Sequence, residues 1–471
     1  MPPAQEGIPY VPSVETPWPG AIAALSRFFR SAGLMAQARV ADIAQSLINR
    51  HGQSRPAGPP PIGPMKAGSF AEIPAYKALL KHRGLAKLLG LVDPFYKCHD
   101  ARLGAHIWIG QRCYTNFASY DYLGFNRHPS VIEAATAAIA RHGTSVSASR
   151  IVAGERPFHR DLEKALADLY GVEDAVTFVS GHATNVSTIA TLLSSDDLVL
   201  HDELVHNSVL IGVKLSQATA RSFRHNDLNV LENLLKQNRT LHKRALIAVE
   251  GLYSMDGDVP NLPRLIELKE RYGAWLMVDE AHALGVLGSR GHGSAEHFGV
   301  DPASVDIWMG TLSKALASCG GYIAGKNELI DLLRFQAPGL VYSVGLAPPL
   351  AAAASAALQL LKNEPERVAS LQSNGRLFLA EATAAGLNTG TSQGHAIVSV
   401  IVGDLVNAGR LTERLLARGV NVLPIIFPAV PIKAARLRFF ITSEHTPAQI
   451  RDIVRLLREE LDDLRHGRKA A

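Results

Sequence analysis

The strongest constraint on the fold comes from residues 275–325, where two short apolar runs each end abruptly at polar residues. The runs at 274–278 (AWLMV) and 306–309 (DIWM) contain aromatic and β-branched side chains and are too short for surface helices, which favours buried parallel strands. Reactive groups in open α/β sheets collect at the carboxyl ends of such strands. We therefore expect the polar residues behind both runs to share one crevice. They are Asp279, His282, Thr311, Ser313 and Lys314.

Lys314 decides which chemistry to expect in this crevice. A lysine among small and hydroxyl residues suits either phosphate binding or Schiff-base formation. Residues 309–312 contain one glycine, so the Gly-rich loop of a nucleotide-binding lysine is absent and the Schiff base is favoured. Pyridoxal 5'-phosphate (PLP) needs such a lysine and an acidic partner for its pyridine nitrogen, a role that Asp279 fits. The alternative is that Asp279 caps a helix and Lys314 is a solvated surface residue. Because Asp279 and Lys314 each follow an apolar strand of their own, PLP binding is favoured over this alternative.

The composition is that of a globular protein with more than one domain. The chain has 471 residues, of which 47% are hydrophobic and 19% charged, enough for a substantial core. The formal charge of +5 is small and no basic stretch is interleaved with aromatics, so nucleic acid is not an expected partner. No run of about 18 apolar residues spans a membrane and the N-terminus lacks a signal-peptide pattern. We therefore expect a cytoplasmic protein.

The cysteines give no sign of a metal site. Only Cys98, Cys113 and Cys319 occur, and none forms a CxxC pair, so we expect a reducing compartment and no metal. Cys319 lies close to Lys314 in sequence, yet a small buried thiol is favoured over a nucleophile.

Residues 1–75 differ in character from the rest and are expected to form a helical N-terminal extension. Prolines dominate its start, a Pro/Gly linker occupies 55–64, and 21–50 reads as an amphipathic helix. This helix is expected to pack on its own protein. The cluster Arg27, Phe28, Phe29 and Arg30 makes docking of a carrier protein, or peripheral membrane contact, the minority alternative.

The remaining chain predicts an arm, a large domain and a small domain. Residues 76–130 predict a helix and a short antiparallel ribbon, 131–360 an alternating helix–strand domain, and 361–471 a smaller α+β domain. Strands are expected at 175–179, 198–200, 245–249, 274–278, 307–309 and 322–324, and in the small domain at 396–401 and 436–441.

Other strand ends also carry informative residues. After Val179 the segment SGHATN turns into a helix, exposing backbone N–H groups to an anion such as phosphate. His206 follows another strand and suits either stacking on an aromatic ring or helix capping. Ser254, in the segment EGLYSMDGD, suits either the site or a simple turn.

Eight collinear motifs resemble one family, the α-oxoamine synthases, which are fold-type-I PLP enzymes. The resemblance covers roughly residues 93–465. The family includes serine palmitoyltransferase, aminolevulinate synthase, aminoketobutyrate ligase and the oxononanoate synthase of biotin synthesis. The motifs are SYDYLGF (119–125), SASRIVAG (147–154) with His159, SGHATN (180–185), HDELVHNS (201–208), VEGLYSMDGDV (249–259), VDEAHALGVLG (278–288), GTLSKALASCGGY (310–322) and ARLRFFITSEHT (435–446).

The resemblance implies a fold and a site. The fold is that of aspartate aminotransferase-like PLP transferases, with a mainly parallel seven-stranded sheet. The implied catalytic residues are Lys314, His206, Asp279 and His282. The implied cofactor-binding residues are Gly181, His182, His206, Ser254, Asp279, His282, Thr311, Ser313, Lys314 and, reaching the neighbouring subunit's phosphate, Ser343. The implied substrate-binding residues are Arg438 for the amino acid's carboxylate, Tyr120 and Asp121.

The resemblance also implies the reaction and the partners. A small amino acid would condense with an acyl thioester of coenzyme A or of an acyl carrier protein, with loss of carbon dioxide, in a homodimer that shares its sites. Tyr120, Ser313 and the segment SEHTPAQI (443–450) resemble serine palmitoyltransferase-like members and favour serine with a long acyl chain in lipid biosynthesis, whereas His182 replaces an aromatic residue common in relatives. The alternatives are another α-oxoamine synthase using glycine or alanine, an aminotransferase, or a non-catalytic partner subunit.

Overall fold

The computed structural model describes most of the chain beyond the N-terminal segment. The described ranges are 68–88, 90–99, 104–427 and 429–466. Backbone packing divides the chain into two compact units, residues 1–78 and 79–471. The helix predicted over 21–50, with Arg27 to Arg30, lies outside the described residues. In the described part of the chain, no helix is long and apolar enough to cross a membrane.

The first described elements are short and largely exposed. A 3-10 turn, η1 (Phe70–Glu72), is capped by Ser69 and leads into helix α3 (Pro74–Leu88). Pro74 suits the start of a helix, because a first-turn N–H has no intrahelical acceptor. The helix predicted at the start of 76–130 is confirmed. It ends at Leu88, before Gly90, whose φ is +69°.

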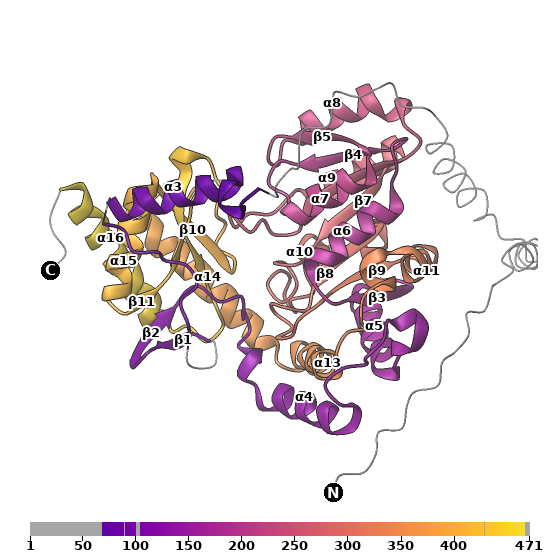
Figure 1. Cartoon of the computed structure of the whole chain (residues 1–471), viewed down its shortest axis with the longest axis horizontal. Coiled ribbons are helices and arrows are strands. Elements are labelled where there is room, and N and C mark those ends of the chain that lie inside the picture. Colours follow the sequence, from indigo (N-terminus) through magenta and orange to yellow (C-terminus); the bar gives the residue numbers. More distant parts are fainter. Residues whose placement is uncertain (1–67, 89, 100–103, 428, 467–471) are drawn as a thin grey trace, which may run out of the picture. The chain divides into compact units, whose positions relative to one another are not determined.

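The large sheet has seven strands in the order β3-β9-β8-β7-β6-β4-β5 (Figure 1). Its strands are β3 (Asp174–Phe178), β4 (Leu198–Asp202), β5 (Thr219–Phe223), β6 (Ala245–Glu250), β7 (Trp275–Asp279), β8 (Ile307–Thr311) and β9 (Gly321–Gly325). Only β9 runs antiparallel to its neighbours. All six strands predicted for this domain are confirmed. The edge strand β5 was missed because its middle, Ala-Arg-Ser, is exposed and carries no apolar alternation.

The sheet is buried on both faces, which explains its continuous apolar runs. In β6, Ala245, Ile247 and Val249 belong to one hydrophobic core, and the alternating Leu246 and Ala248 belong to a second core on the other face. The helices of this region are α4 (Pro129–His142), α5 (Pro157–Tyr170), α6 (Gly181–Leu192), α7 (Asn207–Ser216), α8 (Leu228–Asn238), α9 (Leu262–Tyr272), α10 (Ser294–Phe298), α11 (Asn327–Gln336), α12 (Pro338–Val341) and α13 (Pro348–Asn363).

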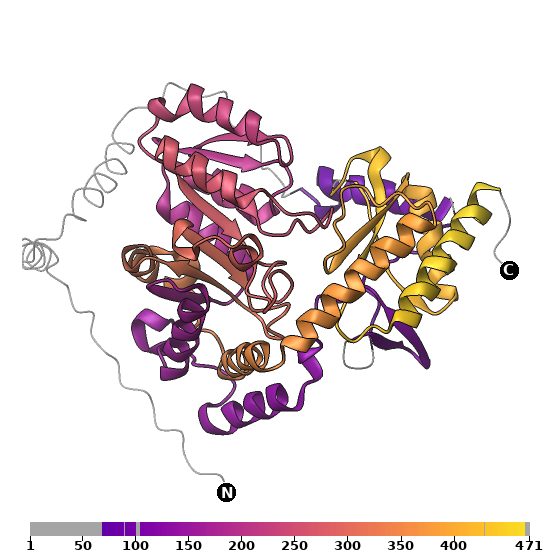
Figure 2. The ribbon, with the colours of Figure 1, turned by 180° about the vertical axis from the view of Figure 1, so that it is seen from behind.

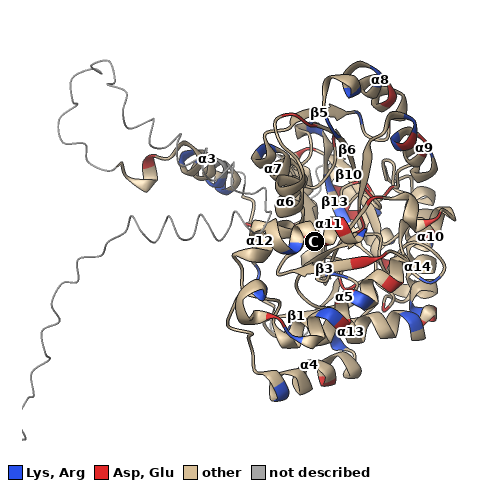
Figure 3. Cartoon of the chain, turned by 90° about the vertical axis from the view of Figure 1, so that its right-hand side faces the viewer, with Lys and Arg blue, Asp and Glu red and all other residues tan. Residues whose placement is uncertain are grey.

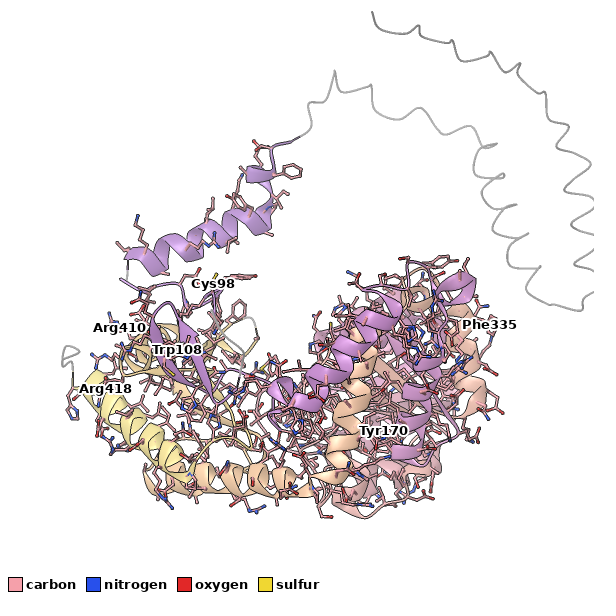
Figure 4. All side chains as sticks on the ribbon, turned by 90° about the horizontal axis from the view of Figure 1, so that it is seen from below. Cys98, Trp108, Tyr170, Phe335, Arg410 and Arg418 are labelled. Carbon is pink, nitrogen blue, oxygen red and sulfur yellow. The ribbon has the colours of Figure 1, made fainter. Side chains whose placement is uncertain are left out.

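Aromatic packing anchors β8, the strand that leads to Lys314. Trp308 is fully buried and its ring stacks on Tyr170 of α5 at 5.2 Å between centroids. The Tyr170 hydroxyl, which lies among the packed side chains in Figure 4, is 2.7 Å from the Tyr322 hydroxyl of β9. Trp308, Tyr170 and Tyr322 thus pack together in one core on one face of β8 and β9.

The C-terminal elements form a second, smaller sheet with helices. They are α14 (Pro365–Ala384), β10 (Ile397–Gly403), α15 (Leu405–Ala417), β11 (Val420–Asn421), β12 (Leu423–Ile425), β13 (Ala435–Phe440) and α16 (Pro447–Arg465). Strands β10, β13 and β12 form an antiparallel sheet, and α14 and α16 lie side by side (Figure 2).

The predicted ribbon consists of β1 (His106–Ile109) and β2 (Arg112–Asn116). Strand β11 pairs in parallel with β2, so the ribbon extends a sheet made with C-terminal residues. This pairing joins segments about 300 residues apart and could not be read from local pattern. The domain boundaries drawn at residues 75, 130 and 360 stay predictions.

The α/β fold class is confirmed, but one smaller expectation is wrong. Cys319 is exposed, as are Cys98 and Cys113, because it lies in the loop between β8 and β9 rather than in the core. Charged residues of both signs alternate on α8 and α9 (Figure 3), where ion pairs such as Arg264 with Glu232 join the two helices.

Candidate active site

The carboxyl ends of β6, β7 and β8 and the start of α6 surround one cavity of about 220 Å³. Of the residues predicted for the site, those that line this cavity are Gly181, His182, His206, Ser254, Asp279, His282, Thr311, Ser313 and Lys314. Parallel strands bring these segments together because all three strands end at the same edge of the sheet.

Lys314 lies in a tight turn after β8 and points at an imidazole. The Thr311 hydroxyl donates to the Gly320 carbonyl at 2.8 Å, and the Ser318 amide donates to the Leu312 carbonyl at 2.9 Å, which closes the turn. The Lys314 Nζ is 2.9 Å from the His282 Nε2. Burial lowers the pKa of Lys314 to about 8, against the opposing attraction of Asp279 and Glu250. Its amine is therefore partly neutral near neutral pH.

The rate at which cofactor-free protein captures an aldehyde should therefore rise with pH around a midpoint near 8. Only the neutral amine attacks an aldehyde, and the Lys314 pKa of about 8 makes the amine mostly protonated below that pH and mostly neutral above it. Stopped-flow growth of visible absorbance after mixing with PLP, from about pH 6 to about pH 10, measures the midpoint. Nα-acetyl-lysine, whose side-chain amine is free, is the control. A midpoint at the ordinary lysine pKa of about 10.4 would contradict the prediction.

Asp279, the last residue of β7, presents its carboxylate to the cavity. One oxygen accepts the Ala281 amide at 3.0 Å, and the other accepts the Asn185 side-chain amide at 2.9 Å. The alternative that Asp279 caps a helix is not seen, because residues 281–286 form turns. One oxygen caps this turn, and the other contacts Asn185 of α6. Asn185 belongs to the motif SGHATN, but the sequence did not mark it as a site residue. Nothing in the sequence shows which group a buried amide contacts.

His282 joins Lys314 to a tyrosine. The ring Nδ1 is 2.6 Å from the Tyr122 hydroxyl, and burial, followed by the charges of Lys314 and Arg438, lowers the pKa of His282 well below its ordinary value. A neutral imidazole therefore bridges the two groups. It can donate one hydrogen bond and accept another without adding a charge to the cavity. Tyr122, fully buried, was missed as an individual residue although it lies in SYDYLGF.

His206 combines the two roles that the sequence left open. It is the N-cap residue of α7, where its Nδ1 accepts the Ser208 amide at 3.3 Å and is 2.6 Å from the Ser208 hydroxyl. The same ring lines the cavity. Burial lowers the pKa of His206, so the ring is largely neutral and suited to lie against a flat heteroaromatic face.

The other end of the cavity suits a phosphate. Gly181 and His182 form the first turn of α6, and Ser180 caps that turn by accepting the Ala183 amide. First-turn N–H groups have no intrahelical acceptor, and the helix dipole favours an anion there. A Cβ on Gly181 would come within 3.1 Å of the Thr311 hydroxyl, so the backbone and this hydroxyl are close enough to share one ligand. With Asp279, Lys314 and two imidazoles, this donor set fits PLP.

Glu250, the last residue of β6, is a cavity residue that the sequence reasoning overlooked. It stands beside Asp279 in the sheet register, and burial together with the Asp279 charge raises the pKa of Glu250 to about 8. One oxygen accepts the Ser254 amide at 3.2 Å, and the other has no partner among the described residues. Glu250 is therefore mostly protonated near neutral pH.

The predicted substrate residues fall into two groups. The Tyr120 ring lies 5.7 Å from the Lys314 Nζ, and the Arg438 guanidinium donates to the Ser254 carbonyl at 3.0 Å beside the cavity. By contrast, the Asp121 carboxylate accepts the Asn126 amide and caps the chain locally. Ser343 lies in the loop after α12 and does not line the cavity of its own chain. The assignment of Asp121 to substrate binding stays a prediction.

The Arg438 side chain is half-buried and incompletely paired. Its guanidinium lies 4.6 Å from the centre of the Phe440 ring, and its Nε has no hydrogen-bond partner in the described structure. Burial lowers the pKa of Arg438, although the group remains a cation. A buried guanidinium with spare donors is suited to a carboxylate.

Comparison with known proteins places the chain in one family. The aminotransferase class I and II family matches residues 113–457. The 8-amino-7-oxononanoate synthase of Beijerinckia indica subsp. indica is 42% identical over 348 residues, covering 73% of this chain and 88% of that protein. 8-amino-7-oxononanoate synthase 1 of Bacillus subtilis is 38% identical over 351 residues, covering 74% of this chain and 89% of that protein.

A solved structure points to the same group. A serine palmitoyltransferase from S. paucimobilis with a bound PLP–myriocin aldimine has a TM-score of 0.80 at 28% identity, covering 85% of this chain and 100% of that chain. The chain therefore belongs to the aminotransferase class I and II family and, within it, is an α-oxoamine synthase, a PLP-dependent C-acyltransferase of fold type I.

Proposed function

We propose that this α-oxoamine synthase condenses alanine with a dicarboxylic acyl thioester. The new carbon–carbon bond joins the amino acid's α-carbon to the acyl carbonyl carbon, and the thiol and carbon dioxide leave. The observation that carries the choice of substrate is the 38–42% identity to 8-amino-7-oxononanoate synthases over about three-quarters of the chain.

The name of those relatives' product defines the substrate chemistry. In 8-amino-7-oxononanoate the amine stands on carbon 8, next to the ketone and to a terminal methyl group. Cleaving between carbons 7 and 8 leaves the skeleton of alanine on one side and a seven-carbon acyl group ending in a carboxylate on the other. Glycine would lack the methyl group, and serine would add a hydroxyl.

The residues of the cavity supply binding, orientation and proton transfer. When bound, PLP withdraws electrons from the amino acid's α-carbon. Asp279 would face the pyridine nitrogen. Lys314 would hold the cofactor and act as the base that removes the α-proton. His206 would lie against the ring, and Gly181, His182, Thr311 and Ser313 would hold the phosphate.

Arg438 binds the amino acid's carboxylate in this proposal. Its spare donors and its position beside Ser254, which lines the cavity, support that role. The carboxylate is later lost as carbon dioxide, so Arg438 orients the bond that breaks. Tyr120, half exposed beside Lys314, forms part of the wall toward solvent.

Arg438→Gln should raise the KM for the amino acid by about two orders of magnitude, because removing one member of a buried charge pair leaves the carboxylate unpaired. We expect kcat and the KM for the acyl thioester to change by much less. Arg410→Gln, which removes an exposed arginine of α15 (Figure 4), is the matched control. Equal amino-acid KM values for both variants would contradict the assignment.

Serine with a long-chain acyl thioester is the second candidate. The TM-score of 0.80 to a serine palmitoyltransferase, at 28% identity, favours it, as do Tyr120 and Ser313 in the sequence. The two candidates predict different pocket chemistry, because a long acyl chain ends in a methyl group and the seven-carbon chain ends in a carboxylate.

The experiment is a substrate matrix with the purified, PLP-loaded protein. Alanine, serine and glycine are each paired with heptanedioyl and hexadecanoyl thioesters, carried by coenzyme A or by an acyl carrier protein, and free thiol release is measured. Highest kcat/KM with alanine and the heptanedioyl thioester supports the first proposal. Highest kcat/KM with serine and the hexadecanoyl thioester replaces it with the second.

We also propose that the chain acts as a homodimer. Tyr342, next to Ser343, is 86% exposed, and Ile151 and Val152 are exposed on the neighbouring turn η3 (Arg150–Gly154), which contacts α12. Phe335 of α11, at the rim in Figure 4, is 64% exposed. An apolar surface of this kind is suited to a second copy. A solution mass of twice the chain mass supports the dimer, and a monomer that retains full activity contradicts it.

Residues 1–64 are proposed to dock the acyl carrier or a membrane surface. This proposal rests on the cluster of basic and aromatic residues at 27–30. Deleting residues 1–64 should raise the KM for the acyl thioester or reduce binding to anionic vesicles, with cofactor absorbance unchanged. Unchanged acyl KM and unchanged vesicle binding would exclude both roles.

A further inference from the structure

A half-buried histidine outside the cavity is held between two aspartates from different parts of the sheet. His225 follows β5, Asp202 ends β4 and Asp258 lies in the loop after β6. The His225 Nδ1 is 3.0 Å from one oxygen of Asp202, and its Nε2 is 2.8 Å from an oxygen of Asp258. The three side chains thus join the carboxyl ends of neighbouring strands around one ring.

His225 is a cation in this setting. Hydrogen bonds and charge from Asp202 and Asp258 outweigh burial and raise the pKa of His225 to about 10. The Tyr253 ring packs edge-on against the imidazole at 4.5 Å between centroids, and the His225 amide donates to Glu203. Both ring nitrogens are therefore donors over the physiological pH range, so both aspartates are held at once.

Asp258 closes a short loop, residues 253–258, which we call the Ser254 loop. The Tyr253 amide donates to the Asp258 carbonyl at 2.9 Å, and the Gly257 amide donates to the Tyr253 carbonyl at 2.9 Å. Gly257 has a φ of +78°, and a Cβ there would lie 2.2 Å from the Ile397 carbonyl oxygen, so the loop packs tightly on β10. Moving Asp258 therefore moves the whole loop.

The Ser254 loop carries the backbone groups that seat two arginines of β13. The Ser254 carbonyl accepts Arg438 at 3.0 Å, and the Met255 carbonyl accepts Arg436 at 3.1 Å. Asp256 forms an ion pair with Arg436. A chain of direct contacts thus runs from His225 through Asp258 and the loop to the guanidinium of Arg438.

We propose that His225 is a positioning residue for amino-acid binding, holding the Ser254 loop so that Arg438 meets the substrate carboxylate. This inference rests on the role of Arg438 in the proposed function. It assigns a task to a charged cluster that touches neither cofactor nor substrate.

The test uses His225→Gln in the full-length, PLP-loaded enzyme. Glutamine keeps the approximate length of the side chain but removes its charge and its second donor direction. The matched control is Arg244→Gln, because Arg244 pairs with Asp197, which is buried just before the start of β4, at the opposite end of that strand from Asp202. Both variants deprive a buried aspartate of its cation, and both should lower the melting temperature.

Only His225→Gln should change amino-acid binding. We expect its amino-acid KM to rise on the order of tenfold to a hundredfold, as for a small misplacement of a binding group. Its kcat, its acyl-thioester KM and its visible cofactor absorbance should stay close to wild type. The inference is overturned if His225→Gln and Arg244→Gln have the same KM for the amino acid. It is also overturned if kcat falls and the KM values for both substrates rise together.

A double variant separates this inference from the proposed function. If His225 acts through Arg438, then His225→Gln combined with Arg438→Gln should have the amino-acid KM of Arg438→Gln alone, whereas additive increases overturn the inference. If Arg438→Gln itself leaves the KM unchanged, the proposed anchor and this inference both fail. If His225→Gln does not fold, Asp258→Asn takes its place, since it weakens the same contact while the Asp202 contact remains.

Discussion

Lys314→Ala is expected to lower kcat/KM by at least about 10⁴-fold, because it removes both the covalent attachment of the cofactor and the general base. Purified variant protein should also lack the visible absorbance band that wild type shows with PLP. The Lys314 amine is the group in the cavity suited to react with an aldehyde, and burial has already brought its pKa to about 8. Steady-state kinetics and an absorbance spectrum of the dialysed protein measure the two effects.

The matched control for this variant is Lys326→Ala. Lys326 follows β9, is exposed and lies outside the cavity, so its removal should leave kinetics and spectrum unchanged. If Lys314→Ala kept the absorbance band after dialysis, or lost activity only as much as the control, another amine would have to hold the cofactor.

Asp279→Asn is expected to lower kcat by on the order of 10³-fold. It removes a carboxylate charge that stabilises the transition state more than the bound substrate. Asparagine keeps the size of the side chain and can still contact Asn185, but it cannot stabilise a protonated pyridine nitrogen. We expect weaker PLP binding and a shifted absorbance maximum, measured by titrating cofactor-free protein.

Asp306→Asn is the control for that loss. Asp306 stands at the beginning of β8, at the far end of the sheet from the cavity, where it pairs with Lys269 and accepts the Leu276 amide. This variant should lower the melting temperature without lowering kcat. Similar kcat values for both variants would show that Asp279 contributes only to folding.

The residues that sequence reasoning found share one property: each follows a strand that can be recognised locally. Asp279, His282, Thr311 and Lys314 all come after apolar runs, and parallel strands end at a common edge. His206 was recognisable for the same reason. The edge strand β5 and the short β11 and β12 were missed, because exposed or very short strands carry little hydrophobic pattern.

The buried strands and the polar residues at their ends could be read from the sequence, because burial on both faces demands continuous apolar runs. Which of those residues are neighbours depends on the three-dimensional fold. It set Glu250 beside Asp279, brought the Asn126 amide to the Asp121 carboxylate and exposed Cys319. It also joined His225 to aspartates 23 and 33 residues away. The physical reason is that side-chain contacts depend on strand register and loop path, which local periodicity does not encode.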